Sequence, residues 1–550
     1  MKKSSRIMSA LLAAAMLVVS AAGCSNSGTE TSSASSDTAT SSSAAEGESS
    51  AAESGASDAA PLSGKITVEV FDRGNTGGSD PTNNHWTNWI KEKFTAETGV
   101  EVEFVSVPRS EEVPRLNVLM ASNSAPDISY TYTASVVYNF YKNGGLADLS
   151  SSLENYGQEL MAYLGDELLT YGQFDGVQVA IPAKRISRAK YATYIRKDWL
   201  DKLGMEMPTT KEEFHEALTA FKEQDPGGVG ENLIPYEAWS DVTWCFGQIM
   251  DSFIDYSADD KELAINYVSG IPITMPGYKD GMKWINQLYN EGLIDPQFPL
   301  YKDNVTPDAN ASAGFVGAYS HSYDYPLRTS PGIITELTKA IPDAEFVPVD
   351  CFENPHMDNK TVKQLYDPAG LLIFVPATSQ NVDGAIAYLN WLSDYDQRFY
   401  ITCGEEGTNH TLDENGIPVM VNVEGEMIMN SANNLDYAVI LNGVDLDDET
   451  KNLEVLSKSY EPGLEDIFMQ AYEVSTANGL TVPRIATPTN AEAQYGSNLA
   501  EKAKEVIANA IVAPVDQFDA IYDAGIQEYL TAGAQQCIDE RSAAWDAENP

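Results

Sequence analysis

Two short stretches of the sequence combine aromatic rings with carboxylate, hydroxyl and imidazole groups. They are residues 236–246 (YEAWSDVTWCF) and residues 319–325 (YSHSYDY). Aromatic rings pack against the C–H faces of sugars, and planar polar side chains bind sugar hydroxyls. We therefore predict that these stretches form the aromatic walls of a ligand site, through Trp239, Asp241, Trp244, Tyr319, His321 and Tyr323. The alternative is an ordinary core, and for Trp244 the two interpretations have equal support.

Polar side chains elsewhere in the chain could complete such a site. They are Asp72, Asn75, Asn83 and His85 in one Gly/Asn/Asp-rich segment, Asp127 and Tyr130 further along, Arg185, and Glu406. Arg185 could bind a carboxylate or an anomeric oxygen, and Glu406 lies in a Gly-flanked segment that could reach a ligand. Because Asn and Asp also form turns, each of these residues has a structural alternative. For Glu406, and for Asn409 beside it, a solvated turn is the stronger interpretation.

Motifs for catalysis are missing from the sequence. There is no His-Glu-x-x-His, no Gly-x-Ser-x-Gly and no P-loop. Residues 187–190 match Ser-x-x-Lys without a Lys-Thr-Gly companion, and paired carboxylates among 81 acidic residues discriminate nothing. The histidines and cysteines are dispersed without metal-ligand spacing. We predict no catalysis, no cofactor and no metal, and leave open whether Cys245, Cys351, Cys403 and Cys537 form disulfides or are buried thiols.

Length and charge limit the fold and the partners. A chain of 550 residues is several times the size of a single small domain. Lys and Arg number 34 against 81 Asp and Glu, which gives a net charge of −47. Such a surface repels phosphate backbones and acidic lipids, so we expect no nucleic acid and no direct electrostatic binding to membranes. Neutral or cationic partners are favoured.

The N-terminus has the pattern of an export signal. Three basic residues precede an apolar run over residues 8–22, which is too short to span a bilayer. Residues 21–24 (AAGC) resemble a bacterial lipobox, in which the cysteine is acylated, so we predict a signal peptide over residues 1–23 and lipidation at Cys24. Ordinary secretory cleavage is the alternative. Residues 24–62 then form a Ser/Ala/Thr-rich tether that has too few apolar residues for a core.

The elements that must position the candidate residues alternate between strand and helix. Residues 64–71 and 100–104 have the period-two pattern of strands. Between them, Trp86, Trp89, Ile90 and Phe94 form the apolar stripe of a helix. This βαβ unit predicts a parallel sheet, with ligands at the carboxyl ends of its strands, where the 72–85 segment lies. Further helices are expected near 281–290, 385–398 and 499–510, a helix capped by Thr210 and Glu213, and a strand over 371–375.

Six segments, in this order behind the lipobox, give the sequence a resemblance to the extracellular solute-binding proteins of ABC importers. They are residues 94–102 (FTAETGVEV), 119–128 (LMASNSAPDI), 145–149 (GLADL), 194–204 (YIRKDWLDKLG), 291–296 (EGLIDP) and 404–407 (GEEG). The chain is identified as a member of this group, in the branch that includes maltose-binding protein and large lipoproteins of Gram-positive bacteria.

The resemblance implies an α/β fold of the two-lobe periplasmic-binding-protein type (type II). An N-terminal lobe would comprise residues 63–187 and about 370–480, and a C-terminal lobe residues 188–369 and about 481–550. The chain would cross between the lobes near 185–191 and 367–372. It implies a monomer, anchored by lipid on the extracellular face of the cell membrane, that closes on a small solute and delivers it to ABC permease subunits.

Two further questions concern the identity of the solute and calcium binding at one loop. The family and the aromatic residues favour an oligosaccharide, with peptides and uronates as alternatives; the acidic surface argues mildly against uronates, although Arg185 and Lys184 could compensate. A secreted polysaccharide-active enzyme and a surface glycan adhesin are alternatives from other classes. Many relatives carry a calcium loop at the position of Asp225, but here Gly227 and Val229 lack the oxygens that calcium needs, so we predict no calcium there.

Overall fold

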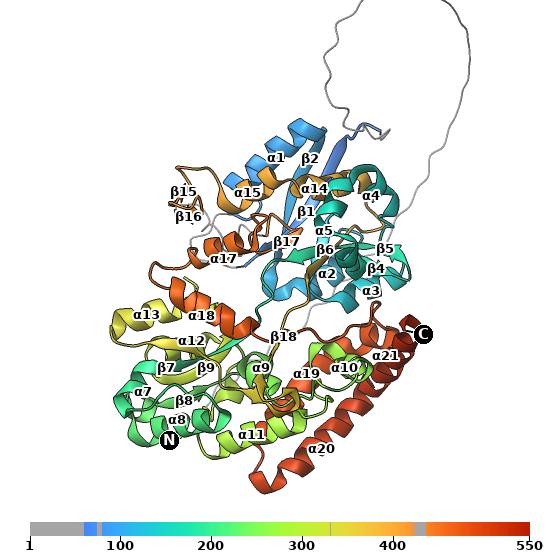
Figure 1. Cartoon of the computed structure of the whole chain (residues 1–550). Coiled ribbons are helices and arrows are strands. Elements are labelled where there is room, and N and C mark those ends of the chain that lie inside the picture. The colour runs from blue at the N-terminus through green and yellow to red at the C-terminus, as the bar shows by residue number, and fades with distance from the viewer. Residues whose placement is uncertain (1–59, 74–79, 330–331, 422, 424–435, 550) are drawn as a thin grey trace, which may run out of the picture. The chain divides into compact units, whose positions relative to one another are not determined.

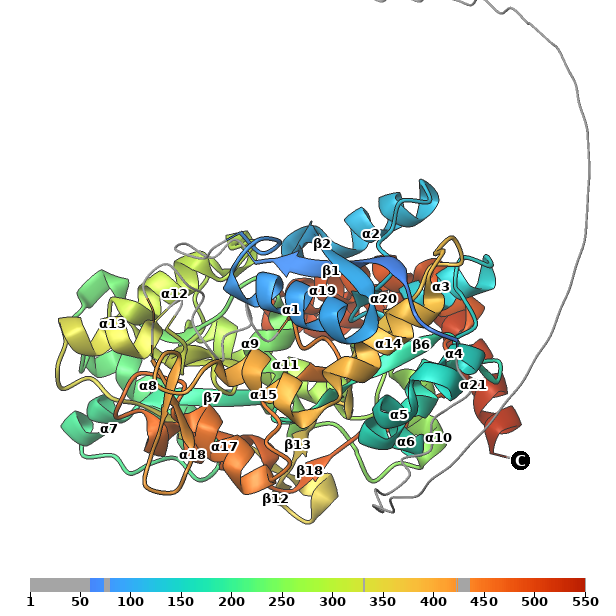
Figure 2. The ribbon, with the colours of Figure 1, turned by 90° about the horizontal axis from the view of Figure 1, so that it is seen from above.

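The predicted βαβ unit is present at the start of the folded chain. In the computed structural model, which describes residues 60–73, 80–329, 332–421, 423 and 436–549, strands β1 (Gly64–Asp72) and β2 (Val100–Pro108) pair in parallel. Helix α1 (His85–Thr98) connects them and packs on β2 (Figure 2). Its N-cap Asn84 accepts the amide of Thr87, and Gly99 ends it at φ 78°, a conformation that favours glycine.

The N-terminal lobe is built on a mixed sheet. Its four-stranded part has the order β17–β6–β14–β3, from Leu441–Asn442, Ala180–Arg185, Ala369–Phe374 and Ser129–Thr131. The amide of Glu69 donates to the carbonyl of Ile128 at 2.9 Å, which joins β1 and β2 to β3. Helices α4 (Ser150–Tyr156), α5 (Gln158–Leu164) and α14 (Val382–Leu392) pack together over a core that includes Ile66, Phe94 and Ile373.

The C-terminal lobe has its own sheet and its own core. The strand order is β10–β7–β9–β8, from Phe346–Val349, Tyr191–Arg196, Val316–Ser322 and Ile234–Glu237, and only β8 and β9 run parallel. Helices α7 (Lys197–Leu203), α8 (Lys211–Gln224) and α9 (Val242–Asp251) lie around these strands (Figure 1). A second α/β core that includes Trp199, Phe214 and Ile249 confirms the expected fold class.

Two segments carry the chain between the sheets. Residues 186–190 connect β6 to β7, and residues 365–368 precede β14, which already pairs with β6 from Ala369 onward. Helix α18 (Glu465–Thr476), which the predicted boundaries placed in the N-terminal lobe, buries Phe468 and Ala471 in the C-terminal lobe. The apolar face of α18 packs on β10 and β7, so the chain enters the C-terminal lobe before residue 465.

The predicted helices are present with shifted ends. Helices α11 (Tyr278–Asn290) and α19 (Asn490–Val512) extend beyond the expected ranges. The expected helix over 385–398 is two helices, α14 and α15 (Tyr395–Cys403), because Asp394 caps a new start. Thr210 caps α8, but Glu213 binds Thr209 instead of completing a box with Thr210.

The remaining elements complete the fold. The helices are α2 (Glu112–Ala121), α3 (Ala134–Lys142), α6 (Asp166–Leu169), α10 (Asp260–Asn266), α12 (Val305–Ser312), α13 (Ile333–Ala340), α17 (Glu449–Ser457), α20 (Phe518–Tyr529) and α21 (Gln535–Glu548). The short strands are β4 (Gln173–Phe174), β5 (Val177–Gln178), β11 (Glu353–Asn354), β12 (Lys360–Thr361), β13 (Lys363–Gln364), β15 (His410–Leu412), β16 (Pro418–Met420) and β18 (Gly479–Leu480).

The four cysteines of the described residues are buried free thiols: Cys245, Cys351, Cys403 and Cys537. Of the two possibilities that the sequence left open, the structure therefore has thiols and no disulfide among these residues. Cys24 and its neighbours lie outside the described residues.

Candidate functional site

The carboxyl ends of β8 and β9 bring three of the predicted aromatic residues together. Because the two strands are parallel neighbours, they end at the same edge of the sheet. Trp239 follows β8, Trp244 lies in the first turn of α9, and His321 lies near the end of β9. The His321 ring is stacked on Trp239 and Trp244, with centroid distances of 5.1 and 5.5 Å.

A fourth ring closes this group, which we call the aromatic cluster: Trp239, Trp244, His321 and Tyr325. Tyr325 stacks on His321 at 3.5 Å between centroids, and its hydroxyl donates to Asp308. Trp239 is only 4% exposed, whereas Trp244 is half-buried and keeps part of its ring accessible. The cluster thus combines the buried indole of Trp239 with the half-buried rings of Trp244, His321 and Tyr325, and a partly open ring of this kind can stack on a sugar face.

His321 is held in its neutral form. Burial lowers the pKa of His321 to about 3, and the charge of Arg328 adds to this effect. The Nδ1 atom of His321 accepts the amide of Ser322 at 2.7 Å, which leaves the proton on Nε2. A neutral ring stacks between aromatic neighbours without the cost of burying a charge.

Polar groups lie around the edge of the aromatic cluster. Asp241 accepts from Thr243 at 2.7 Å and from Lys504 of α19 at 3.3 Å, and its side chain remains partly exposed. Glu237, at the end of β8, is fully buried and accepts from Asn310 at 2.8 Å. Burial raises the pKa of Glu237 to about 8, so this carboxyl is protonated at neutral pH.

Tyr319 and Tyr323 lie in the core of the C-terminal lobe, apart from the stacked rings. They are 2% and 6% exposed and pack with Tyr194, Phe346 and Phe468. The hydroxyl of Tyr323 accepts from Ser187, which lies in the first crossing segment. In the present conformation, therefore, these two rings have the surroundings of core residues.

In the N-terminal lobe, two predicted residues make structural contacts. The carboxylate of Asp127 accepts from the amide and hydroxyl of Thr67, both at 2.8 Å, and from Ser379 at 2.6 Å. These bonds tie β1 to the turn after β14. Tyr130 is 1% exposed and packs edge-on against Phe71 at 4.8 Å.

The other N-terminal candidates are exposed and dispersed. Asp72 ends β1 on the surface, Asn83 accepts a long bond of 3.4 Å from Asn88, and His85 bonds to the hydroxyl of Tyr400 at 3.1 Å. Glu406 is exposed in the turn before β15. Asn75 lies outside the described residues.

Arg185 lies at the end of β6 and contacts residues that the sequence did not single out. Its guanidinium group lies over the ring of Tyr366 at 4.3 Å and donates to Asn442 at 3.2 Å. Tyr191, also missed, packs edge-on against Trp244 at 5.3 Å. Both tyrosines adjoin the predicted crossing segments, and their position there was the available indication.

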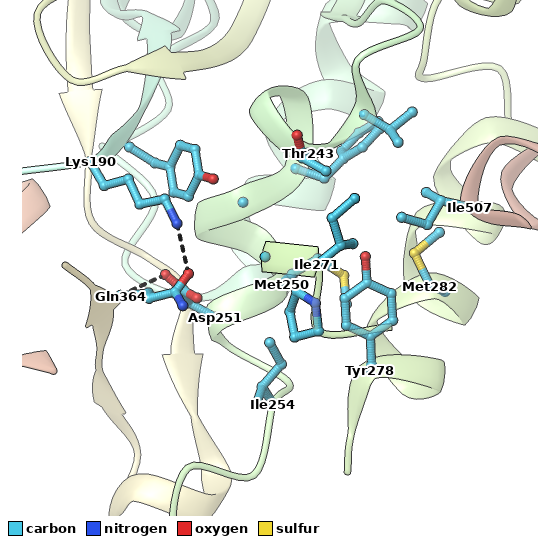
Figure 3. A pocket seen from close by; sticks show the side chains of 16 residues that line it. Lys190, Thr243, Met250, Asp251, Ile254, Ile271, Tyr278, Met282, Gln364 and Ile507 are labelled. Carbon is cyan, nitrogen blue, oxygen red and sulfur yellow. Dashed lines mark hydrogen bonds between the residues drawn. The ribbon is translucent and has the colours of Figure 1, made fainter. Parts of the chain in front are cut away.

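A small cavity lies beside α9 (Figure 3). It has a volume of about 40 Å³, and its lining includes Tyr191, Thr243, Met250 and Ile507. At its polar end, Lys190 donates to the side-chain oxygen of Gln364 at 2.9 Å. The backbone N–H of Gln364 in turn donates to the carboxylate of Asp251 at 2.9 Å. A space of this size has room for a few water molecules and is too small for a sugar ring.

Among the described residues, no group of three or more His, Cys, Asp or Glu side chains is placed to hold a metal ion. Asp225, in the degenerate loop, instead accepts the amides of Val229 and Gly230 at 3.0 and 2.8 Å. Its carboxylate closes the loop on itself. The expectation of no calcium there stays a prediction.

Two α/β lobes joined by crossing segments define the class of a two-lobe binding protein, and solved structures agree. The alginate-binding protein AlgQ2 superposes with a TM-score of 0.62 at 17% identity, over 88% of this chain and 98% of that one. An extracellular solute-binding protein from Bifidobacterium longum subsp. infantis gives 0.61 at 17% identity, over 88% and 98%. At such identities the likeness establishes the fold, and it confirms the predicted architecture.

The chain belongs to the bacterial extracellular solute-binding proteins, whose family model matches residues 89–399. It is 28% identical over 225 residues to the fructooligosaccharide ABC transporter substrate-binding protein FusA of Streptococcus pneumoniae serotype 4, which is 38% of this chain and 41% of FusA. It is 28% identical over 219 residues to the lipoprotein LipO of Bacillus subtilis, 37% and 40% of the two chains. The matched stretches thus span about two fifths of these curated relatives. The family confirms a binding protein in place of an enzyme.

Within the part of the chain that the structure describes, no helix is long and apolar enough to cross a membrane.

Proposed function

We propose that this protein is the substrate-binding component of an ABC importer and that it captures an oligosaccharide between its two lobes. The aromatic cluster is the observation that carries this proposal: Trp244 is half-buried, stacked on His321, and placed at the carboxyl edge of a sheet where α/β folds bind ligands. The family and the name of FusA, a fructooligosaccharide-binding relative, agree with it.

The proposed site consists of the accessible face of Trp244, with Trp239, His321 and Tyr325 behind it and Asp241 at its rim. Asp241 is partly exposed and could accept from sugar hydroxyls while it is paired with Lys504. Asp72, Asn83 and His85 of the opposite lobe remain predicted contacts. A ligand that touches both lobes would stabilise a closed form, by its difference in affinity for the two states.

We further propose that Cys24 is acylated and holds the protein on the extracellular face of the membrane, where it meets ABC permease subunits. The lipobox-like segment and the lipoprotein relative LipO support this. Labelling of expressing cells with a radioactive fatty acid tests the anchor: the native chain should be labelled and Cys24→Ser should not.

Ligand binding is tested by thermal shift and titration calorimetry with a panel of neutral oligosaccharides, uronates and peptides. At a hundredfold excess over Kd, a true solute stabilises the fold by about 2.7 kcal/mol. Trp244→Ala should weaken the binding of any hit by about tenfold or more, because a stacked ring is lost. Trp284→Ala is the matched control, since Trp284 is also half-buried in this lobe but packs near Phe253. Binding of peptides alone would contradict the proposal.

A further inference from the structure

Four basic side chains gather where the chain crosses between the lobes. We call them the hinge cations: Arg185, Arg188, Lys190 and Arg484. Three of them surround Tyr366: the Arg185 guanidinium lies 4.3 Å and the Lys190 ammonium 5.6 Å from its ring centroid, and Arg188 Nε donates to its carbonyl at 2.8 Å.

The fourth, Arg484, comes from the segment between α18 and α19. Its guanidinium lies 3.6 Å from the ring centroid of Tyr171 and donates to the hydroxyl of Thr170 at 2.8 Å. Arg484 and the other three hinge cations all interact electrostatically with the carboxyl group of Asp367. Desolvation raises the pKa of the Asp367 carboxyl, and the charges of Lys190, Arg484, Arg188 and Arg185 all oppose that rise.

Every hydrogen bond recorded for the hinge cations goes to a neutral acceptor. The acceptors are the side chains of Asn442, Thr481, Gln364 and Thr170 and the carbonyls of Tyr366 and Ala486. Lys184, one residue before Arg185, is by contrast paired with Asp445 at 3.1 Å. Acidic residues outnumber basic ones more than twofold in this chain, yet among the described residues none of these four neighbouring cations has a carboxylate as hydrogen-bond partner.

The charge of these four side chains is only partly compensated, because Asp251 acts on Lys190 and Asp367 acts on all four. The side chain of Asp367 is exposed. The Nε atom of Arg185 is shielded from solvent and has no hydrogen-bond partner within the described structure. Unpaired buried donors and unpaired charges are costly, and an anion that enters the site would relieve both costs.

The hinge cations also adjoin the aromatic cluster. Lys190 lies over the ring of Tyr191 at 4.8 Å, and Tyr191 packs edge-on against Trp244 at 5.3 Å. A ligand ring on Trp244 would thus have positive charge within the reach of its substituents. Arginine is well suited to this role, since its planar guanidinium can bind both oxygens of a carboxylate.

We propose that the hinge cations bind a sugar carboxylate, so that the solute is an acidic, uronate-type oligosaccharide. This rests on the proposed function and specifies its substrate class. It reverses the weight that the net charge of −47 gave to neutral solutes, because local charge at the site, and not the mean charge of the surface, decides recognition of a bound group. The competing interpretation is that the four side chains only fasten the crossing segments together.

The first test uses the unaltered protein and a matched pair of ligands. Trigalacturonate and its fully methyl-esterified form have the same sugars, with and without charge, and calorimetry compares their affinities with those for neutral fructo- and malto-oligosaccharides. We expect trigalacturonate to bind at least tenfold more tightly than its ester, as charge-assisted hydrogen bonds are lost in the ester. The preference should shrink as salt is raised.

The second test uses variants. The double variant Arg185→Gln with Lys190→Gln should lose most of the preference for the charged form, and Arg185→Lys should recover part of it. Lys222→Gln is the control with an equal charge change per site, since Lys222 is exposed on α8 and donates to the backbone carbonyl of Glu291, far from the hinge cations in sequence. Circular dichroism and melting curves confirm that each variant folds.

The outcomes separate the two proposals. Equal binding of acid and ester, or binding of neutral oligosaccharides alone, overturns the carboxylate site and leaves the proposed function standing. A preference for the acid that survives the double variant also overturns the role of these side chains. No binding of any oligosaccharide, acidic or neutral, contradicts the proposed function itself.

Discussion

The two lobes treat their predicted ligand residues in opposite ways. In the C-terminal lobe, Trp239 and Trp244 come from one stretch of sequence and His321 from another, and each tryptophan stacks on His321 within 5.5 Å. In the N-terminal lobe, Asp127 is occupied by Thr67 and Ser379, and Asn83 and His85 lie exposed on or beside α1. Large rings collect where strands end, whereas small polar side chains are often used by the nearest backbone.

This contrast indicates which residues of such a site can be assigned from the sequence. A tryptophan outside a core stripe has few structural uses, so its presence near a strand end is informative. A loop carboxylate can cap, turn or bridge, and all three uses look alike in sequence. Substitutions in the aromatic cluster and at the polar residues of the other lobe test this contrast.

The largest expected effect is in the aromatic cluster. Trp239→Ala removes a ring that is 4% exposed and leaves His321 without one of its stacking partners, so it should destabilise the fold by about 3–5 kcal/mol. Urea unfolding followed by circular dichroism measures this. Trp239→Phe should retain a large part of the stability. A loss below about 1 kcal/mol for the alanine variant would show that the cluster is not close-packed.

Asp127→Asn should have the next largest effect, on stability and not on binding. The substitution weakens three hydrogen bonds between β1, β3 and the turn after β14, at a cost of about 1–3 kcal/mol. Solute affinity should remain as in the parent protein. An affinity loss with unchanged melting temperature would return Asp127 to the ligand site and erase the contrast.

A pH profile compares one buried carboxyl in each lobe. Burial raises the pKa of Glu69 and of Glu237 to about 8, from 4.5 when unfolded. Each group therefore contributes stability that is complete below pH 4.5 and is lost as the pH rises to about 8. The melting temperature should fall between pH 5 and 8, and Glu237→Gln and Glu69→Gln should each reduce that fall.

The contribution of His321 to folding stability has the opposite pH dependence. The pKa of His321 is about 3 in the folded state against 6.5 unfolded, so its contribution is complete above pH 6.5 and is lost as the pH falls toward 3. His321→Phe should therefore flatten the acid side of the profile alone. If the parent melting temperature does not change on either side, these groups are not buried as described.

The smallest expected effect is at Asn83. Asn83→Ala removes an exposed side chain with one long hydrogen bond, so stability should change by less than about 0.5 kcal/mol. Any loss of solute affinity should stay below about tenfold, the value of one ordinary hydrogen bond. A larger loss by calorimetry would make the N-terminal lobe an equal partner in binding.

Much of the fold was predictable because it follows from local patterns. The alternation of Ile66, Val68 and Val70, and the stripe of Trp86, Ile90 and Phe94, specify a strand and a helix whose βαβ connection has few alternatives. The break between α14 and α15 was missed because Asp394 lies between two apolar segments that continue the same period. The place of α18 was missed because its apolar face does not indicate which of two cores it joins.

The site was only partly predictable, for a related reason. Parallel pairing of β8 and β9 brings Trp239 to His321, and the sequence contained both residues but not their pairing. Tyr319 and His321 are two positions apart on strand β9. Tyr319 nevertheless packs on Phe346 in the core, whereas His321 stacks on Trp239. The hinge cations come from two distant segments, residues 185–190 and Arg484, and only the folded chain brings Arg484 to the other three.

The buried thiols have a consequence for a protein of an oxidising environment. Cys245, Cys351, Cys403 and Cys537 are each buried as free thiols, so the described part of the fold does not depend on a disulfide between them. A molecule that unfolds, however, presents four unprotected sulfur atoms to external oxidants and can crosslink before it refolds. Close packing thus acts here as the shield that a disulfide framework provides in other secreted proteins, and its protection lasts only as long as the native state does.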